Sequence, residues 1–583
     1  MKVVKRNGKF VDFDEEKIRI AINKANATVM DSKRIPDRGI DNIIKYIKSL
    51  DKKRILVEDI QDIIEEKLMS KGYYELARNY ITYRYSRAIA RKTNTTDEII
   101  LGQIKRDFKD NANILTAANV RDLISSLISN DLSRRILLKE DIISSHDKGI
   151  IYFGGLDYYI EPMINYSYID IGEMLLNGFV MNGIKVSTPK SLEVAVNHMI
   201  RIVLNVLDNQ YGKVVLNLSS FGKYINLSRE KIINSLDSLK IKSVKDKENF
   251  INNKLKKEIE SLCQMIIYEF NTRTLKNGKS LGVIFLLDTN NEYRELLEMF
   301  YKTLIDEKSK GILYEDDSYR KVVYPKLIYV LNEYTDYKYF NKVLKDNNEL
   351  SFVSDNKYKS LKIGHFNKGE VYLNMLDIAL NSKNIEDYYK LIDERLITVK
   401  EALICKCESL LGTYASISPI HYLYGGISRL QNDSKIDSLI DNNYSSLTIH
   451  ILGLYESMCN LKLNNDDVLN IIKYLYNKVN IMEKELNLGI LLDGTYNKEI
   501  SRYFIDKCRS MYQLDRKLNK EEYYKPYIIY EKDLYKRISN DKEYAKYFKG
   551  GYITYINLSN NINYEKLLKY CKDNKGYIEF INK

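Results

Sequence analysis

The sequence predicts an α/β protein of several domains, in which a small unit of one hairpin and a few helices precedes a much larger domain. The chain has 583 residues, and single hydrophobic cores stop growing at roughly 250–300 residues, so at least two domains are expected. An Asn7-Gly8 pair between two short apolar runs marks a tight hairpin near the start. Further along, strand-like and helix-like segments alternate without a repeat period, which is typical of α/β folds.

The first unit is expected to span residues 1–92. Residues 3–11 form its hairpin, because Asn-Gly supplies the positive φ angles that a tight turn needs. Asp14 is the predicted N-cap of the next helix, with Glu15 and Glu16 at its positive end. Apolar residues at helical spacing predict two more helices, one across residues 60–68 and one across residues 76–88.

The second unit is expected to span residues 111–583, after a polar junction at 93–110 that includes the stretch Thr93 to Asp97. Apolar runs predict strands at 311–314, 322–331 and 551–556. Helical spacing predicts helices at 164–176 and 190–207, and another across 401–411. Together they predict α/β architecture for the large domain.

Charge and composition exclude several classes of protein. Lys and Arg number 91 and Asp and Glu 79, giving a formal net charge of +12. These charges are spread along the chain without a dense basic stretch, so we expect solvated surface and no nucleic-acid partner. No apolar run reaches the ~20 residues of a membrane helix, so no membrane association is expected. The polar start after Met1 carries no secretory signal, and we expect a cytoplasmic protein.

Neither the cysteines nor the histidines predict a metal site. The six cysteines are too sparse for a disulfide scaffold, and we expect each to be a small buried hydrophobe. The five histidines show no metal-ligand spacing. These residues are Cys263, Cys405, Cys407, Cys459, Cys508 and Cys571, and His146, His198, His365, His421 and His450.

The first unit resembles the ATP-cone, the nucleotide-sensing domain of many ribonucleotide reductases. The stretches VVKRNGKFVDFDEEKI and VEDIQDIIEEKLMSKGYYELARNYITYR carry the resemblance, which covers residues 1–92. It implies ATP or dATP as an effector. A triphosphate needs convergent cations, which Lys5, Arg6 and Lys17 supply. The positions matching the nucleotide site are Lys5, Arg6, Asn7, Gly8, Lys17, Gln61, Arg84 and Arg87.

The large domain resembles the catalytic domain of the anaerobic (class III) ribonucleoside-triphosphate reductases. The resemblance implies a glycyl-radical-type ten-stranded α/β barrel entered by a finger loop, and a homodimer. It rests on an ordered set of stretches: HDKGIIYFGGLDYYIEPMIN (146–165), MLLNGFVMNGIKVSTPKSLEVAVNHM (174–199), NQYG (209–212), YEFNTRTLKNGKSLGVIFLLD (268–288), VVYPKLIYVL (322–331), VYLNMLDIAL (371–380), IDERL (392–396), LLGTYASISPIHYLYGGISRL (410–430) and GGYITYINL (550–558).

The sequence departs from this family at the residues of its radical chemistry. A glycyl radical there oxidises a finger-loop cysteine, whose thiyl radical takes hydrogen from the ribose. The matching stretch 353–365 contains no cysteine. Asn165 is followed by Tyr166 where many relatives have a second cysteine, and Gly154-Gly155 replaces a His-Asp pair.

The zinc-binding C-x-x-C pairs and the radical glycine of the family would follow residues 576–583, and the sequence contains neither. We therefore expect no catalytic residues, no zinc, no other metal and no glycyl radical.

Two functions are compatible with these features. The first is a catalytically degenerate relative that binds ATP or dATP and acts as a regulatory or partner subunit, with a reductase or activase subunit as its partner. The alternative is an active anaerobic ribonucleoside-triphosphate reductase whose zinc and glycyl-radical segment is a separate polypeptide. The missing finger-loop thiol favours the first. The sequence does not name the preferred nucleotide or the biological role.

Overall fold

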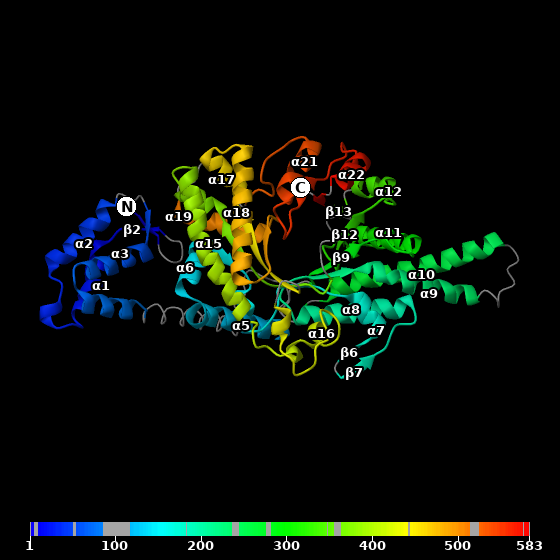
Figure 1. The fold of residues 1–583 in the computed structure, drawn as a ribbon, viewed down its shortest axis with the longest axis horizontal. Coiled ribbons are helices and arrows are strands. Elements are labelled where there is room, and N and C mark those ends of the chain that lie inside the picture. The colour runs from blue at the N-terminus through cyan, green and yellow to red at the C-terminus, as the bar shows by residue number, and fades with distance from the viewer. Residues whose placement is uncertain are drawn as a thin grey trace.

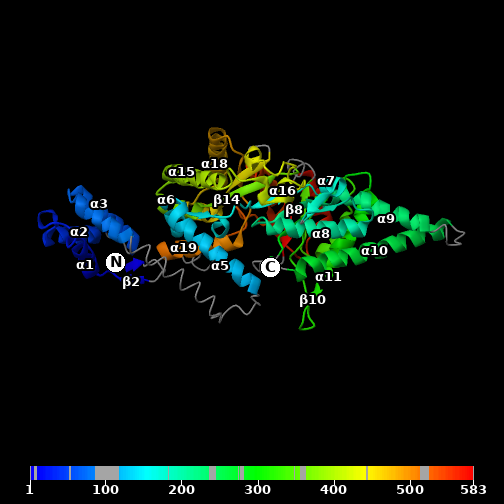
Figure 2. The same ribbon diagram turned by 90° about the horizontal axis from the view of Figure 1, so that it is seen from below.

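The structure is a computed structural model. It describes residues 2–4, 10–50, 54–85, 117–181, 183–235, 244–273, 275, 281–346, 348–354, 363–440, 444–512, 524–574 and 576–581. The described parts form an elongated body, with the N-terminal unit at one end and a projecting helix pair at the other (Figures 1 and 2). The barrel lies between them.

The N-terminal unit is a three-stranded sheet packed against helices. Strand β1 (Lys2–Val4) pairs antiparallel with β2 (Phe10–Asp12) and parallel with β3 (Arg54–Leu56). The helices are α1 (Glu15–Asn26), α2 (Asp37–Ser49), α3 (Val57–Ser70) and a helix across residues 74–85. Asp14 caps α1 by accepting from the Glu16 N–H, which confirms that predicted cap. The predicted Asn7-Gly8 turn lies outside the described residues.

This unit has a hydrophobic core of its own. Isoleucines dominate it, and Ile22, Ile40 and Ile47 are fully buried. Helix α2 buries Ile40, Ile43, Ile44 and Ile47, the spacing of one helical face. The helices predicted after Asp14 and across residues 60–68 are confirmed as α1 and α3, and the one across 76–88 is confirmed as far as residue 85, whereas α2 and strand β3 were not predicted.

The large domain is built on a ring of ten strands, and the order of the strands around the ring differs from their order along the chain. Around the ring the strands are β16 (Ile490–Asp493), β15 (Ser445–Leu452), β14 (Phe366–Asn374), β5 (Tyr166–Tyr168), β8 (Val214–Asn217), β9 (Val283–Leu287), β12 (Lys326–Leu331), β13 (Ser351–Ser354), β18 (Tyr577–Ile581) and β17 (Thr554–Asn557). A short strand, β4 (Ile151–Phe153), adds to β14 outside this order.

The ring closes between β16 and the start of β17. Asp493 and Gly551 form a parallel bridge, with the Gly494 N–H donating to Gly551 O and the Gly550 N–H to Leu492 O, both at 2.9 Å. Strands β5, β8, β9, β12 and β13 are parallel to one another, as are β14 to β18. The two halves meet antiparallel at β14/β5 and β13/β18. The expected ten-stranded barrel is thus confirmed.

Helices cover the outside of the barrel. One apolar cluster packs helices α8, α9, α10, α11, α12, α21 and α22 against the first half of the barrel. A second cluster packs helices α6, α14, α15, α17 and α18 against the other half. The helices are α5 (Ala117–Leu132), α6 (Glu140–Lys148), α7 (Ile171–Asn177), α8 (Leu192–Asp208), α9 (Phe221–Ser235), α10 (Val244–Thr272), α11 (Arg294–Lys310), α12 (Tyr337–Lys345), α14 (Met375–Asn381), α15 (Ile385–Glu408), α16 (Pro419–Tyr422), α17 (Leu454–Leu461), α18 (Asn465–Leu486), α19 (Lys498–Met511), α21 (Leu534–Ala545) and α22 (Tyr564–Asp573).

Two small hairpins lie off the barrel. They are β6 (Phe179–Met181) with β7 (Ile184–Val186), and β10 (Ile312–Leu313) with β11 (Tyr319–Arg320). A single π-helical segment, Ser133–Leu137, follows α5. The helix pair α9 and α10 projects at the end of the molecule (Figures 1 and 2).

Most predicted elements of the large domain are present, and one was wrong. The helices at 190–207 and 401–411 correspond to α8 and the end of α15, and the strands at 322–331 and 551–556 to β12 and β17. The strand at 311–314 is β10, which lies outside the barrel. The helix predicted at 164–176 is instead strand β5 followed by α7, because Asp170 caps α7 by accepting from the Glu173 N–H at 2.9 Å.

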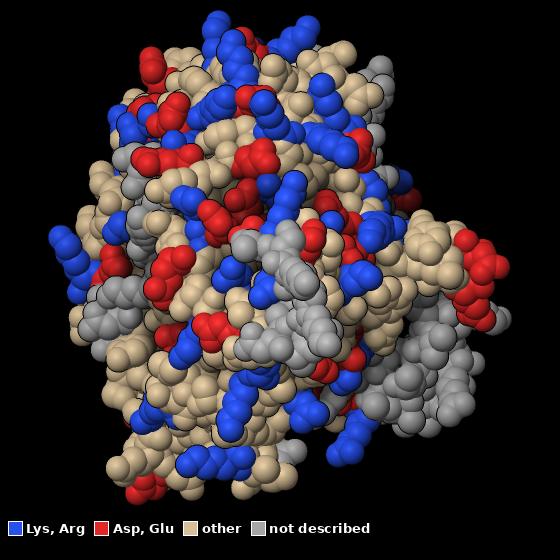
Figure 3. Space-filling view, turned by 90° about the vertical axis from the view of Figure 1, so that its right-hand side faces the viewer, with Lys and Arg blue, Asp and Glu red and all other residues tan. Residues whose placement is uncertain are grey.

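Two surface properties complete the description. Within the described residues, every helix is too short or too polar to cross a membrane. On the face at the α9–α10 end, Lys and Arg side chains are interspersed with Asp and Glu (Figure 3).

Candidate functional site

Three of the eight residues predicted to bind nucleotide lie in the described part of the first unit. Lys17 is exposed on α1, where its Nζ lies 3.2 Å from the Asp14 carboxylate. That ion pair lowers the pKa of Asp14. Gln61 is half-buried on α3. Lys5, Arg6, Asn7, Gly8 and Arg87 lie outside the described residues, so their convergence stays a prediction.

Arg84, the third of these residues, is held by three carboxylates of α3. Its guanidinium donates to Glu58, Asp62 and Glu65 at 2.9, 2.7 and 2.8 Å. Burial alone would lower the pKa of Arg84, but Glu65 and Asp62 raise it. These ion pairs tie the helix at 74–85 to α3. Any phosphate that Arg84 contacts therefore competes with three acids already in place.

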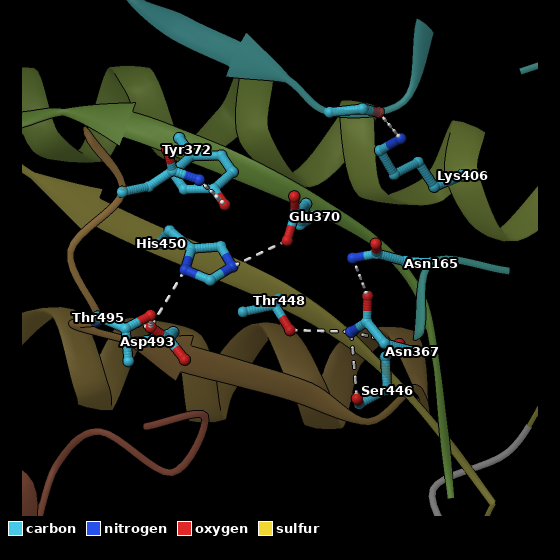
Figure 4. A network of polar contacts seen from close by, with 12 residues as sticks. Asn165, Asn367, Glu370, Tyr372, Lys406, Ser446, Thr448, His450, Asp493 and Thr495 are labelled. Atoms are coloured by element: carbon cyan, nitrogen blue, oxygen red, sulfur yellow. Dashed lines mark hydrogen bonds and ion pairs between the residues drawn. The ribbon is translucent and has the colours of Figure 1, made fainter. Parts of the chain in front are cut away.

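The barrel interior has an apolar half and a polar half. In the first half, strand residues that face away from the outer helices form a cluster containing Leu286, Ile328, Val330 and Val353. In the second half, several positions that face the interior are polar: Asn367 and Glu370 on β14, Thr448 and His450 on β15, and Asp493 on β16. Figure 4 shows these polar side chains meeting across the three strands.

His450 on β15 lies at the centre of the polar half, between two carboxylates. Its Nε2 is 3.2 Å from Glu370 Oε2 on β14, and its Nδ1 is 3.1 Å from Asp493 Oδ1 on β16. Burial alone would lower the pKa of His450, but Asp493 and Glu370 raise it to about 10. At neutral pH the ring is therefore an imidazolium that donates from both nitrogens.

Both carboxylates are ionised for the same reason. Burial would raise the pKa of Glu370 and of Asp493, but the cationic ring of His450 holds both below their usual range. Asp493 Oδ1 also accepts from the Thr495 N–H at 2.6 Å and from its hydroxyl. A buried ion pair is tolerated only when its lone pairs are satisfied in this way.

Tyr372 covers one face of the His450 ring. The two rings are stacked, with centroids 4.2 Å apart and an interplanar angle of 11° (Figure 4). A cation over an aromatic face is attracted by the ring quadrupole, so this contact favours the charged imidazole further. Burial raises the pKa of the Tyr372 hydroxyl well above its usual range.

A second buried cation, Lys406, reaches the same region from outside the barrel. It projects from α15 and passes beside Gly369, where the register of β14 shifts. A Cβ on Gly369 would collide with the Lys406 side chain, which would then have to move. The Lys406 ammonium donates to Gly154 O and lies 3.8 Å from the Phe153 ring centroid.

The electrostatics of Lys406 follow from this position. Burial lowers the pKa of Lys406 to about 7, while Glu370 acts in the opposite direction. At neutral pH Lys406 is therefore present both as an ammonium and as a neutral amine, beside the cationic His450 and the anionic Glu370 and Asp493. Such a set can hold or exchange protons.

A pair of asparagine side chains extends the hydrogen-bond network to the place where β5 and β14, and so the two barrel halves, meet. Asn165, which precedes β5, donates to Asn367 Oδ1 at 3.0 Å. The amide of Asn367 donates to Thr448 Oγ1 at 2.9 Å and to Ser446 O at 3.2 Å (Figure 4). The interior face of β14 and β15 is therefore hydrogen-bonded across the strands.

All six cysteines of the chain lie on helices outside the barrel ring. They sit on α10, α15, α17, α19 and α22, and all but the exposed Cys459 are buried, largely as expected from the sequence. Burial raises the pKa of Cys508 to about 12, and its thiol contacts the Asn374 amide at 3.5 Å. The described residues contain no group of three or more His, Cys, Asp or Glu that could hold a metal ion.

Two other histidines are buried and neutral. His146 accepts from the Phe153 N–H at 3.0 Å, and burial lowers its pKa to about 3. His421 lies between Ser418 and Gln210, at 2.6 and 3.1 Å, and burial lowers its pKa to about 3 as well. Both are satisfied by hydrogen bonds.

Sequence reasoning missed the His450 network. Its members come from three strands, and His450 and Asp493 are 43 residues apart. The signal was a polar residue at every second position of an apolar run, at Ser446, Thr448 and His450. That pattern marks a strand with one polar face buried by closure of the ring.

Two family models match the chain. Residues 110–358 and 348–583 match the model of the anaerobic ribonucleoside-triphosphate reductase, and residues 1–89 match the ATP cone domain. The matched residues cover well over half of the chain.

Curated relatives are similar over most of the chain. It is 26% identical over 612 residues to the anaerobic ribonucleoside-triphosphate reductase of Haemophilus influenzae, and 25% identical over 619 residues to that of Escherichia coli. Both alignments cover 95% of this chain and 85% of the relative. The phage T4 reductase is 25% identical over 493 residues, 75% of this chain and 79% of its own.

Solved structures share the fold. The anaerobic ribonucleotide reductase from Thermotoga maritima in complex with dATP and CTP superposes with a TM-score of 0.60 at 16% identity, covering 79% of this chain and 82% of that chain. The same protein with MES in the active site gives 0.64 at 16% identity, with coverages of 88% and 90%.

Proposed function

Because the chain belongs to the anaerobic ribonucleoside-triphosphate reductase family and carries an ATP cone in residues 1–89, we propose that it binds ATP or dATP but does not itself reduce ribonucleotides. In this role it is a regulatory or partner subunit whose state depends on adenine nucleotides. The proposal has two parts, one for the cone and one for the barrel.

The position of the thiols carries the barrel part. Family chemistry, as the resemblance implies it, needs a cysteine radical beside the ribose inside the barrel. All six cysteines lie on outer helices, and the segment joining β13 to β14 contains none. Hydrogen abstraction from a ribose carbon has no acid–base substitute.

The groups inside the barrel support the same conclusion. Glu370, His450 and Lys406 move protons and not hydrogen atoms. His450 is also already committed to two carboxylates and the Tyr372 ring. The polar half of the interior thus consists of hydrogen-bonded acid–base groups, and the six thiols lie on helices outside it.

The cone part is supported by the family match and by the exposure of Lys17. That ammonium pairs only with the exposed Asp14 among the ion pairs of the described residues, so water screens it and a triphosphate can compete for it. Lys5 and Arg6 precede it on the hairpin in the sequence. Three cations within one small unit suit a triphosphate.

Assembly and metal content complete the proposal. We include a homodimer, because the family resemblance implies one, and we include a reductase or activase subunit as the partner of a regulatory subunit. We also propose that neither zinc nor a glycyl radical takes part.

Calorimetry on the full chain tests the cone part. ATP or dATP should bind, and the double variant Lys5→Ala with Lys17→Ala should bind about a hundredfold more weakly or worse, since each charge-assisted contact is worth about 1.5–3 kcal/mol. Lys24→Ala, an exposed lysine on the same helix, is the matched control and should bind as wild type does. No heat with either nucleotide, or unchanged affinity in the double variant, would refute the assignment.

A further inference from the structure

The hairpin β10–β11 projects from the body of the molecule as an arm, defined as residues 312–320 (Figure 2). Leu313 on β10 lies directly opposite Tyr319 on β11, and paired residues of an antiparallel hairpin share one face. Leu313 is 45% exposed and Tyr319 is 69% exposed. A two-stranded hairpin is at best marginally stable in water, so a partner surface that covers this apolar face would stabilise the arm.

Contacts within the arm fix its shape. The Tyr314 N–H donates to Ser318 O at 2.9 Å, and the Asp317 N–H donates to Tyr314 O at 3.0 Å. On the other face of the hairpin, the Arg320 guanidinium pairs with Asp316 and lies 4.6 Å from the Tyr314 ring centroid. The arm therefore has a defined shape before it meets a partner, which lowers the entropy cost of association.

The tip of the arm is acidic. It carries three acids, Glu315, Asp316 and Asp317, and one basic residue, Arg320, which leaves two excess negative charges. Asp316 is paired with Arg320, and among the ion pairs of the described residues none includes the other two acids. Complementary charge guides association and selects the partner, so the arm suits a surface of net positive charge. The chain itself carries a formal net charge of +12.

A cleft of about 100 Å³ lies directly beside the arm on the same chain. Its lining includes residues 321–323, which immediately follow β11, and Val323 among them is 72% exposed. Three lysines and two glutamates also line the cleft, so the sign of its charge is opposite to that of the arm. Neither Leu313 nor Tyr319 lines it, so the arm does not fill the cleft of its own chain. The other apolar lining residues are Ile305, Leu327, Val343, Leu350 and Phe580.

The arm and the cleft together make this face of the molecule self-complementary. In a two-fold dimer both chains use the same patch, so an apolar projection on one chain must meet an apolar hollow on the other. Because the projection and the hollow are adjacent here, a single two-fold axis can bring each arm to the opposite cleft, and the contact is then made twice. An unrelated partner would require only one of the two features, so their pairing favours a second copy of this chain.

We propose that the chain forms a two-fold dimer in which the arm of each protomer docks at the cleft of the other. Leu313 and Tyr319 contact the apolar lining, and the acidic tip lies against the positive surface around the cleft. This contact rests on the homodimer included in the proposed function and gives that dimer its surface. None of its residues belongs to the cone or to the His450 network, so the contact does not depend on nucleotide binding.

Sedimentation velocity of the full chain over a hundredfold range of concentration tests the contact. Wild type should dimerise, and the arm variant Leu313→Ser with Tyr319→Ser should raise the dimer dissociation constant about tenfold or more, because it removes the apolar face. Val323→Asp, which changes only the cleft, should also weaken the dimer by placing an acid opposite the acidic tip. Ile184→Ser removes a 70% exposed apolar side chain from the other hairpin and is the matched control. It should dimerise as wild type does.

An equal mixture of the arm variant and Val323→Asp separates docking of the arm at the cleft from general adhesion between apolar surfaces. A mixed dimer keeps one intact arm facing one intact cleft, so the mixture should associate more tightly than either variant alone. Melting temperatures equal to that of wild type show that the variants fold.

If the arm variant dimerises as tightly as wild type, the homodimer stands and the arm contact is wrong. If wild type stays monomeric over the whole range, the homodimer and the arm contact are both wrong, and the arm is left to a different protein partner. Equal weakening by Ile184→Ser, or a mixture that associates no more tightly than its two components, would also overturn the arm contact.

Discussion

The His450 Nε2 atom lies 3.2 Å from Glu370 Oε2, and the opposite ring nitrogen lies 3.1 Å from Asp493. One imidazolium therefore joins three adjacent strands, β14, β15 and β16, from inside the barrel. The bridge between Asp493 and Gly551 closes the barrel at the same residue. Asp493 thus contributes its carboxylate to the charge balance inside the barrel, and its backbone lies at the bridge that closes the wall.

Replacing His450 should strongly destabilise the large domain. His450→Gln leaves the Glu370 and Asp493 carboxylates buried without their cation, and breaking a buried pair costs about 3–5 kcal/mol. Urea unfolding measures the loss. The double variant His450→Gln with Glu370→Gln should recover part of it, because one uncompensated charge is removed. Equal stability of wild type and His450→Gln would show that His450 does not stabilise the two buried carboxylates.

The contribution of His450 to the free energy of unfolding should also decrease at alkaline pH. Its folded pKa, about 10, lies above its unfolded value of roughly 6.5. The stabilisation is therefore fully present below the unfolded pKa and is lost as the pH rises through the folded pKa. The difference in unfolding free energy between wild type and His450→Gln, measured from pH 6 to 10.5, should shrink steadily. A difference that stays constant over this range would show that His450 is neutral in the fold.

Arg84 should matter for the stability of the cone. Arg84→Ala removes the cation that Glu58, Asp62 and Glu65 share, so the cone should lose about 2 kcal/mol, with Asp62 contributing least because it is exposed. The exposed Arg78→Ala on the same helix is the control and should change little. Hydrogen exchange across residues 57–85 reports the loss. Unchanged protection in Arg84→Ala would mean that these ion pairs contribute nothing.

Chelators should leave thermal unfolding unchanged. The thiols lie on separate outer helices, apart from Cys405 and Cys407 on α15, so they do not form a four-thiolate site. Elemental analysis of the purified protein is the companion measurement. Stoichiometric zinc together with a large drop in melting temperature on chelation would show that a metal site exists.

Local signals predicted local structure well. Asp14, Glu15 and Glu16 marked the start of α1, and the run from Leu192 to Leu207 buries one face as its spacing implied. The helix predicted at 164–176 was wrong because Ile164, Tyr168 and Ile171 mimic helical spacing, although Ile164 precedes a short strand, Tyr168 ends it and Ile171 begins the next helix. Asp170 was the available signal for where that helix begins.

Long-range relationships could not be predicted from the residues alone. The ring closes through Asp493 and Gly551, and the Lys406 side chain packs against Gly369, where a Cβ would meet it. Neither relationship leaves a periodic pattern. The barrel itself was predicted through family resemblance, and the His450 network was found only once the strands were placed side by side.

Reduction of ribonucleotides is the most direct test of the central claim that the barrel performs no radical chemistry. The purified protein is incubated anaerobically with a radical-generating activase, S-adenosylmethionine, formate or thioredoxin, and all four ribonucleoside triphosphates, beside an active relative as the positive control. We expect no glycyl-radical signal in the electron paramagnetic resonance spectrum and no deoxynucleotide above the activase-only control. Deoxynucleotides formed by this chain, alone or with a separate radical-bearing polypeptide, would contradict the account and establish an active reductase.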